Sequence, residues 1–270
     1  MKLFAISDLH LGYAQNRDAI AVIDPRPDDW LILAGDIGET SEHLELAFEV
    51  LSTRFRRLVW VPGNHELWTV PSLGASLRGN EKYHQLVDLC RRYGVLCPED
   101  PYPVVTFGTE RVRIVPLFLL YDYSFRPPGM PLASAVEWAA SHRVVCADED
   151  LLHPEPYPDI VTWCNARCDE AEARLQACAD GTPTVLINHF PLRKDLVWLP
   201  RHPEFIIWCG TERTRNWHLR FNASIVVSGH LHMRSTMHRD GVRFEEVSLG
   251  NPGQWAPYTT PNLCVREIIG

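Results

Sequence analysis

Five short apolar runs recur along the chain, and each has the length and composition of a buried β-strand. Every run holds four residues that are almost all aliphatic or aromatic, a pattern typical of strands that are covered on both faces. The runs are Leu3–Ile6, Trp30–Leu33, Leu58–Val61, Thr184–Ile187 and Ser224–Val227. A β-sheet core is therefore the first expectation.

Helices are predicted between these strands, so that the chain alternates between the two kinds of element. The stretches that follow the first three strands are Asn16–Ile23, Glu42–Ser52 and Asn80–Tyr93, and Gly94 supplies a stop signal after the third. A further helix, rich in Ala, Glu and Arg, is expected from Ile160 to Ala179.

Two pairs of shorter strands are predicted elsewhere, each joined by a turn that contains glycine. The first pair meets at Gly108-Thr109 and the second surrounds Asp240-Gly241, a hairpin signal. A helix is also expected to begin at Thr211, a favourable capping residue, and to run to His218. The expected strands are Val104–Phe107, Val112–Leu120, Arg234–Met237 and Val242–Leu249.

Composition narrows the class of protein. The 270 residues are 46% apolar and 22% charged, as in ordinary globular proteins, and no apolar run approaches the ~18 residues of a membrane span. A net charge of −8 argues against a nucleic-acid partner. Met1 leads directly into a strand without room for a signal peptide, and the eight cysteines lack a paired framework. A cytoplasmic protein with reduced thiols is expected, with Cys164 and Cys168 as buried helix residues rather than a metal or redox pair.

Each of the five buried strands is followed by residues that bind hard metal ions. A single cluster of this kind is more often a cap or a turn, but coincidence at all five strand ends is improbable. Ligands that directly follow strands lie at the carboxyl edge of a sheet, where open α/β sheets place their sites. The clusters are Asp8-Leu9-His10, Gly35-Asp36, Gly63-Asn64-His65-Glu66, Asn188-His189 and Gly229-His230-Leu231-His232. About eight converging ligands would be enough for two ions.

The donor types indicate which metals and which chemistry to expect. Carboxylate, amide and imidazole groups without cysteine suit Mn or Fe and, less exclusively, Zn. Asp36 is well placed to bridge both ions, with a hydroxide as the second bridge. Two ions roughly 3.5–4 Å apart can clamp the attacking and leaving oxygens of a displacement at phosphorus. His65 is spare if Asn64 is a ligand, and it would then be a natural general acid.

The order D-x-H, G-D-x-x-E, G-N-H-E, N-H and G-H-x-H resembles that of the calcineurin-like metallophosphoesterases. The resemblance implies that His65 contacts the scissile phosphate. That family usually has an Asp where this chain has Glu39 and an Arg where it has Thr40. Glu39 can still polarise His65, but phosphate must be held in another way. The implied ligands are Asp8, His10, Asp36 and His232 for one ion, and Asp36, Asn64, His189 and His230 for the other.

The resemblance and the strand–helix alternation together imply an α/β fold, with two packed mixed β-sheets flanked by helices in one domain over residues 1–270. A narrower likeness is to a branch of actinobacterial metallophosphoesterases that release the 4′-phosphopantetheine arm from holo-acyl carrier protein. A nucleotide, a cyclic nucleotide or a biosynthetic small molecule is the alternative substrate. A binding scaffold without activity is disfavoured because His65 and every ligand are present. The segments that carry this likeness are Pro27–Trp30, Glu66–Thr69, Pro116–Phe125, Glu149–Pro158, Pro203–Thr211 and Asp240–Ser248.

Two further segments are candidates for substrate recognition. Residues 121–158 are rich in proline and aromatic residues, with one short helix expected near Ala133–His142. They form either a surface excursion or, as we expect of so long a loop, a lid or pocket wall over the metals. Arg193, Lys194 and Arg201 follow a metal-bearing strand end. Any one of them is ordinary surface charge, but as a group they are expected to hold an acidic partner or the substrate phosphates.

Overall fold

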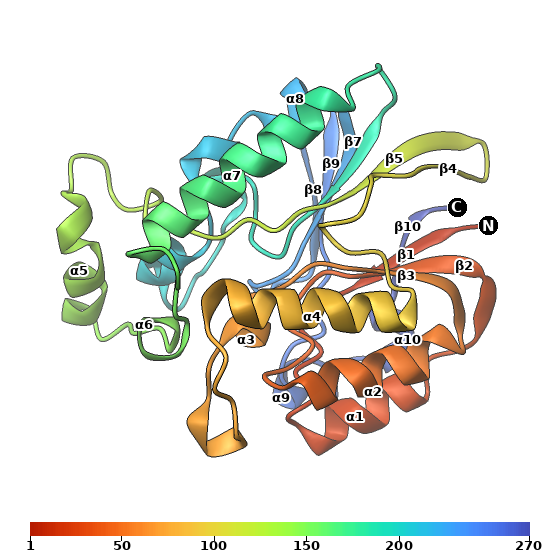
Figure 1. Ribbon diagram of the computed structural model, residues 1–270, viewed down its shortest axis with the longest axis horizontal. Helices are drawn as coiled ribbons and strands as arrows, with labels where there is room; N and C mark the ends of the chain where they lie inside the picture. The colour runs from red at the N-terminus through yellow and green to blue at the C-terminus, as the bar shows by residue number, and fades with distance from the viewer.

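Two mixed β-sheets pack face to face, and helices cover both outer faces (Figure 1). The computed structural model describes all residues from 1 to 270. The four-stranded sheet contains β1 (Leu3–Ile6), β2 (Arg26–Leu33), β3 (Phe55–Trp60) and β10 (Arg266–Ile269). Its order is β10-β1-β2-β3, in which β1, β2 and β3 are parallel and β10 is antiparallel to β1.

The second sheet has six strands in the order β4-β5-β6-β7-β9-β8. Its four central strands are parallel to one another, and the edge strands β4 and β8 are antiparallel to their neighbours. The strands are β4 (Val104–Phe107), β5 (Glu110–Pro116), β6 (Thr184–Ile187), β7 (Ala223–Ser228), β8 (Ser235–Arg239) and β9 (Val242–Glu246).

The sheets share an apolar core because successive strand residues point to opposite faces. Leu3 and Ala5 of β1 belong, with Val185 of β6, to a cluster of 17 buried residues between the sheets. Phe4 and Ile6 belong to a larger cluster of 59 buried residues, which includes residues of the covering helices. Each apolar run is therefore buried on both faces, which explains why it is uninterrupted in the sequence.

Amphipathic helices cover the sheets. In α2, Leu44, Ala47, Phe48 and Leu51 are buried, the spacing of one helical face. Gly94 ends α4 in the left-handed conformation with φ of 65°, as predicted for a stop residue. In Figure 1, α1, α2 and α4 lie beside the four-stranded sheet, and α7 and α8 lie beside the other. The longer helices are α1 (Ala14–Ala21), α2 (Ser41–Ser52), α4 (Gly79–Tyr93) and α7 (Ile160–Ala177).

Short helices occupy the connections near the strand ends. They are α3 (Asn64–Leu67), α5 (Ala135–Ser141), α6 (Asp148–Leu151), α8 (Trp217–Arg220), α9 (Pro252–Trp255) and α10 (Pro261–Cys264). Short 3₁₀-helices lie at Pro71–Leu73, Leu132–Ser134, Lys194–Leu196, Pro203–Trp208 and Glu212–Thr214. The helix expected near Ala133–His142 is thus confirmed within the segment 121–158.

Two predictions about elements need correction. The strand expected over Val112–Leu120 ends at Pro116, because the Leu119 amide donates to the Asn188 side chain at 3.0 Å instead of pairing with a strand. The helix expected from Thr211 to His218 is divided into a 3₁₀ turn and α8. Its break lies next to Thr214, whose hydroxyl donates to the Leu192 carbonyl at 2.7 Å.

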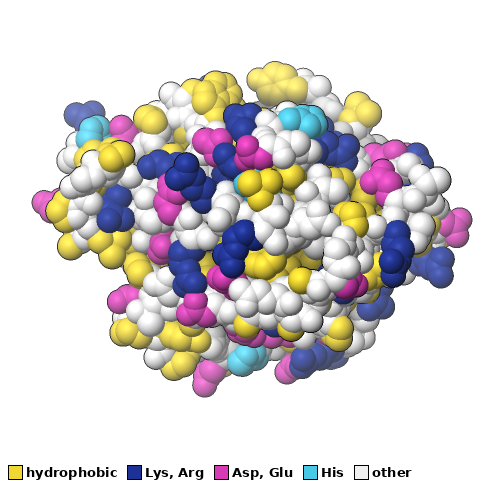
Figure 2. Space-filling view, turned by 90° about the horizontal axis from the view of Figure 1, so that it is seen from above, with side chains coloured by type: hydrophobic (Ala, Val, Ile, Leu, Met, Phe, Trp, Pro, Cys, Tyr) yellow, Lys and Arg dark blue, Asp and Glu magenta, His cyan; other side chains and the backbone are white.

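Strand β10 was not predicted, because its four residues combine two charged side chains with two apolar ones. It pairs with β1, more than 250 positions away along the chain, so its partner leaves no local signal. All eight cysteines are free thiols, and Cys164 and Cys168 are buried in α7 as expected. None of the helices has the length and apolar character needed to cross a membrane. Basic and acidic side chains are interspersed on the face seen from above (Figure 2).

Candidate metal centre

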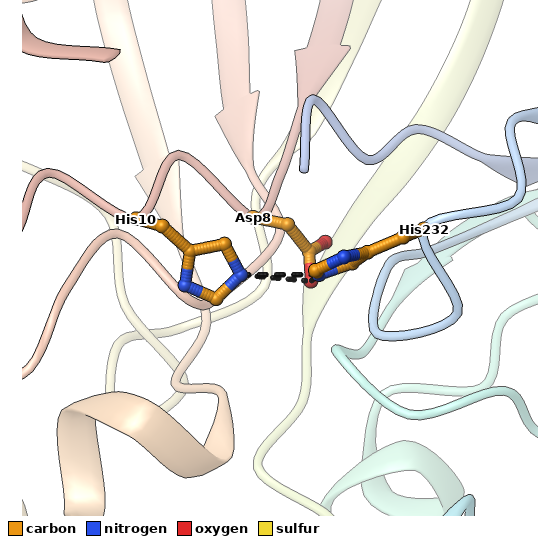
Figure 3. A group of neighbouring side chains, drawn as sticks. All are labelled: Asp8, His10 and His232. Atoms are coloured by element: carbon orange, nitrogen blue, oxygen red, sulfur yellow. Dashed lines mark hydrogen bonds and ion pairs between the residues drawn. The ribbon is translucent and has the colours of Figure 1, made fainter. Parts of the chain in front are cut away.

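Residues that directly follow β1, β2, β3, β6 and β7 come together in one place, although they are spread over more than 220 positions. In Figure 3, the rings of His10 and His232 point toward each other beside the carboxylate of Asp8. In each of three overlapping groups the potential ligand atoms lie within 4.8 Å of one another. The groups are Asp8, His10 and His232; His10, Asp36 and His65; and Asp36, His189 and His230. Asn64 begins α3, immediately before His65.

The backbone at this place adopts an uncommon conformation. Five of the predicted ligands have φ in the left-handed region, which residues other than glycine rarely adopt. Such strained conformations persist where the surrounding structure over-determines them, and they cluster at functional sites. The φ values are 54° for Asp8, 42° for His10, 53° for Asp36, 73° for His230 and 51° for His232.

Glycines next to the ligands allow this close approach. A Cβ atom at Gly63 would lie 2.1 Å from Oδ1 of Asp36, and one at Gly229 would lie 2.4 Å from Oδ2 of Asp8. Neither distance is compatible with a side chain at those positions. The glycines that accompany the ligand residues in the sequence are therefore a steric requirement of the site.

Asp8 is held by hydroxyl donors. Its Oδ2 accepts hydrogen bonds from the Ser7 hydroxyl at 2.5 Å and the Ser248 hydroxyl at 2.7 Å. The backbone amide of His230 also donates to the carboxylate. Burial raises the pKa of Asp8, but the hydrogen bond and charge of His232 outweigh it and hold the pKa well below its usual value. The buried carboxylate is therefore ionised and oriented.

Two imidazoles converge on Asp8. Nε2 of His10 lies 3.1 Å from Nε2 of His232, which itself lies 3.1 Å from Oδ1 of Asp8. Nδ1 of His232 lies 2.8 Å from the side-chain oxygen of Gln254. Because that oxygen can only accept a hydrogen bond, Nδ1 carries the hydrogen. Burial lowers the pKa of His10 to about 4, which leaves its imidazole neutral. Two ring nitrogens and a carboxylate oxygen facing one another are a donor set for a cation.

The four ligands implied for the second ion, Asp36, Asn64, His189 and His230, fit a metal ion because three of their buried polar atoms have no hydrogen-bond partner. They are Oδ1 of Asn64, Nε2 of His189 and Nε2 of His230. Buried polar atoms without partners are rare in proteins and call for an explanation such as an ion. The Nδ1–H of His189 donates to the Ala34 carbonyl at 2.9 Å, which leaves Nε2 as the free lone pair. Burial lowers the pKa of His230 to about 3, so this imidazole is neutral as well.

Asp36 is the residue implied as a ligand of both ions. Its Oδ2 is 3.4 Å from Nε2 of His189 and 3.8 Å from Nε2 of His65, and its Oδ1 accepts from the His65 amide at 3.0 Å. It also shares a ligand group with His10. Burial raises the pKa of Asp36, but the charges of His189 and His65 outweigh it and hold the pKa well below its ordinary value.

Glu66 organises the loop around Asp36, a role that the sequence motif did not reveal. Its buried carboxylate accepts from the backbone amides of Asp36 at 2.9 Å, Ile37 at 2.7 Å and Gly63 at 2.8 Å. Burial, and after it the charge of Asp36, raises the pKa of Glu66 to about 7. The carboxylate thus ties the turn after β2 to the turn after β3.

Asp148 was also missed, because it lies in the irregular segment 121–158, far from any ligand motif. The carboxylate is 1% exposed, and its Oδ1 accepts from Nδ2 of Asn64 at 2.9 Å and from Nε1 of Trp68 at 2.6 Å. Because Nδ2 of Asn64 donates to Asp148, its Oδ1, which has no hydrogen-bond partner, is left free for another interaction. The Trp68 ring lies against His65 with ring centroids 3.7 Å apart.

His65 and Glu39 form a hydrogen-bonded pair at the edge of the centre. Nδ1 of His65 donates to Oε1 of Glu39 at 3.1 Å, so its Nε2 points away from Glu39. Burial lowers the pKa of His65, but the charge of Asp36 and the hydrogen bond to Glu39 outweigh it and raise the pKa above its usual value. Thr40, which replaces the family's arginine, instead caps α2 by accepting from the His43 amide.

The three cations singled out from the sequence differ in their surroundings. Arg193 is largely buried and pairs with Asp195 at 2.8 Å and Asp240 at 2.7 Å. Nζ of Lys194 donates to the Arg126 carbonyl at 2.8 Å. Arg201 is exposed on the surface. Arg193 and Lys194 therefore already have partners within the chain.

Comparison with known proteins shows which family has this arrangement of side chains. Residues 1–234 match the calcineurin-like phosphoesterase family. The chain is 47% identical over 269 residues to a Mycobacterium tuberculosis protein named [acyl-carrier-protein] phosphodiesterase PptH, covering 99% of this chain and 83% of that protein. The crystal structure of phosphopantetheinyl hydrolase (PptH) from the same organism is similar with a TM-score of 0.94 and 45% identity, covering 99% of this chain and 95% of that one. The chain belongs to the calcineurin-like metallophosphoesterases and is a metal-dependent phosphoester hydrolase.

Proposed function

We propose that this enzyme hydrolyses the phosphodiester that joins 4′-phosphopantetheine to a serine of holo-acyl carrier protein. The substrate is suggested by the M. tuberculosis relative, which is named for this class of reaction and is similar over 99% of the chain rather than over the motifs alone. The hydrolytic part rests on one observation, the pair of His65 and Glu39 beside a group of metal-ligand side chains.

The converging ligand side chains are proposed to hold two metal ions. Mn and Fe suit the oxygen and imidazole donors best, and Zn suits them less exclusively. Such a pair of ions supplies a water-derived nucleophile at neutral pH and neutralises charge on the phosphate. The proposed ligands are Asp8, His10, Asp36 and His232 for one ion, and Asp36, Asn64, His189 and His230 for the other.

The chain's own residues are proposed to manage the leaving group. As water oxygen bonds to phosphorus, the bond from phosphorus to the serine oxygen breaks, and that oxygen needs a proton. Nε2–H of His65 donates it, while Glu39 keeps the ring oriented through Nδ1 and stabilises its charged form. The Trp68 ring restricts the other face of the imidazole. The products are 4′-phosphopantetheine and a free serine hydroxyl, with one water consumed.

We also propose that residues 121–158 are a fixed wall of this site within a single domain of 270 residues. Support comes from hydrogen bonds that tie the segment to the rest of the chain. Asp148 accepts from Asn64, and the Thr69 amide donates to the Leu151 carbonyl at 2.8 Å. Nε1 of Trp208 donates to Glu149 at 2.6 Å. A wall of this kind positions ligands, whereas a moving lid would have to break these contacts.

An acidic carrier protein is proposed to dock near the cations that follow β6. Arg193 and Lys194 already have partners, so Arg201 is the most available of the three. Arg201→Glu should raise KM for holo-carrier protein severalfold and weaken its dependence on salt, because rim charges act mainly on encounter. Arg56→Glu, an exposed arginine at the start of β3, is the matched control. An equal rise in KM for a small aryl phosphodiester would contradict a docking role.

The location of the protein and its lack of a nucleic-acid partner are also proposed. A cytoplasmic location is favoured because all eight cysteines are free thiols, as in a reducing compartment. Nucleic acid is not proposed as a partner, since a net charge of −8 is unfavourable for binding a phosphate backbone.

The substrate assignment can be tested directly with purified components. Mn-loaded enzyme is incubated with holo-acyl carrier protein, and the intact mass of the carrier protein is followed, with a panel of nucleotides and cyclic nucleotides assayed in parallel. The proposal expects loss of the phosphopantetheinyl group from the carrier protein and little turnover of the panel. Efficient hydrolysis of a nucleotide, with an unchanged carrier protein, would favour the small-molecule alternative.

A further inference from the structure

A groove of about 420 Å³ opens beside the metal centre, between the loop after β6 and the hairpin of β8 and β9. Its walls are mainly apolar, and the Trp198 side chain on its rim is 63% exposed. The apolar residues that line it are Leu196, Trp198, Leu231, Met233, Met237 and Leu249. Large apolar side chains gathered at the surface mark places where a ligand or partner binds.

The groove is continuous with the metal centre through one residue. His232, a proposed ligand, forms part of its lining, and so does Gln254, whose side chain holds Nδ1 of His232 at 2.8 Å. His65 is not among the lining residues. The ring of His10 lies against both, with centroids 4.6 Å from His65 and 5.0 Å from His232. The groove therefore begins on the flank of the centre that does not carry the general acid.

In the proposed reaction, the two groups attached to the phosphate must extend from the site in two different directions. The serine oxygen leaves from phosphorus and must face His65. The pantetheine arm stays attached to the phosphate, so it must extend along another path while the carrier protein lies on the side of the acid. That arm carries a geminal dimethyl group and methylene chains, interrupted by a hydroxyl and two amides. Apolar walls with a few polar groups, here Arg234, Ser235 and Gln254 beside His232, match this composition.

We propose that this groove binds the pantetheine arm of the substrate, an inference that rests on the proposed function. The two methionines favour an extended and partly flexible guest, because their unbranched thioether side chains adapt to irregular shapes. Trp198 provides a broad apolar surface at the rim, where the arm passes toward solvent. The groove thereby selects for the group that remains on phosphorus, while the metals and His65 act on any phosphodiester.

The test uses 4′-phosphopantetheine as the probe, because this product contains the arm and lacks the carrier protein. Its inhibition constant is measured against hydrolysis of an aryl phosphodiester, so the assay does not require turnover of holo-carrier protein. Trp198→Ala and Met237→Thr should each raise this constant about tenfold, as expected when a large apolar contact is lost. Tyr258→Ala removes an aromatic side chain that is 81% exposed outside the groove and should change nothing.

The Michaelis constants of two substrates complete the experiment, one a holo-carrier protein and the other a short peptide with a phosphopantetheinyl serine. The proposal expects KM for both to rise by a similar factor in the two groove variants. A rise for holo-carrier protein alone, with unchanged inhibition by 4′-phosphopantetheine, would overturn it and make the groove a docking surface for the carrier protein. Unchanged values throughout would overturn it too. If holo-carrier protein is never hydrolysed but the inhibition constants shift, the groove assignment stands and the proposed reaction fails.

Discussion

The two halves of the metal centre are supported in different ways. In the first half, Asp8 accepts hydrogen bonds from Ser7, Ser248 and the His230 backbone, so several donors share the work of orienting it. In the second half, Nδ2 of Asn64 donates to one group, the carboxylate of Asp148, which belongs to the segment 121–158. The orientation of Asn64 in the second half therefore depends on a single contact without a substitute, whereas that of Asp8 in the first half does not.

The largest effect is expected for Asp36, which both halves share. Asp36→Asn should abolish bound metal and turnover, because the bridging position loses its negative charge for both ions at once. Elemental analysis after incubation with Mn²⁺ and desalting measures the metal content, and circular dichroism checks that the variant is folded. A folded variant that keeps two ions and normal turnover would show that Asp36 does not join the two halves.

His65 should separate chemistry from metal binding. His65→Ala is expected to keep both ions and to lose about 10²–10⁴-fold in turnover of an alkyl phosphodiester, the usual contribution of a general acid. An activated p-nitrophenyl ester should suffer less, because its leaving group needs no proton. Equal losses on the two esters would point to a positional role for His65, and loss of metal would make it a ligand.

Asp148 tests the dependence of the second half on its single support. Asp148→Ala should weaken binding of one of the two ions by about 10–100-fold, the usual effect of removing a group that orients a ligand. Calorimetric titration with Mn²⁺ can resolve the two binding events. Asp148→Asn should recover part of the loss, since an amide oxygen can still accept from Asn64.

The control for Asp148 is its neighbour in α6. Glu149→Ala removes a carboxylate that accepts from Tyr123 and Trp208 but does not contact a proposed ligand. It should destabilise the segment 121–158 without a selective loss at one ion. If Glu149→Ala weakens one ion as much as Asp148→Ala does, the effect comes from the segment's stability and not from the orientation of Asn64.

The smallest effect is expected in the first half. Ser248→Ala removes one of the donors to Asp8, while Ser7 and the His230 amide remain, so metal binding should weaken by less than about tenfold, below the usual range. The same titration measures it. A loss as large as that of Asp148→Ala would mean that the two halves do not differ in redundancy.

The convergence of the proposed ligand residues could be predicted from the sequence, because each lies next to a strand whose apolar pattern is local. Parallel strands bring such positions to the carboxyl edge of their own sheet, so Asp8 and Asp36 in one sheet, and His189 and His230 in the other, could each be expected together. The accompanying glycines were also informative, since Gly63 and Gly229 leave no space for a Cβ atom.

The supporting residues could not be predicted, because their contacts depend on tertiary structure. Asp148 lies 84 positions from Asn64 in an irregular segment, and nothing in its local sequence distinguishes it from Asp150 or Glu149. Strand β10 was missed for the same reason, because its partner β1 lies at the other end of the chain. Arg193 looked available in the sequence, but its ion pair with Asp240 forms across 47 positions.

The central claim, that five strand ends build a two-metal centre, is tested most directly by locating the ions. Crystals grown with Mn²⁺ give an anomalous difference map when data are collected at an X-ray energy just above the manganese absorption edge. The account predicts two peaks, one among Asp8, His10 and His232 and the other among Asn64, His189 and His230, with Asp36 contacting both. A single peak, or a second peak outside these residues, would contradict it.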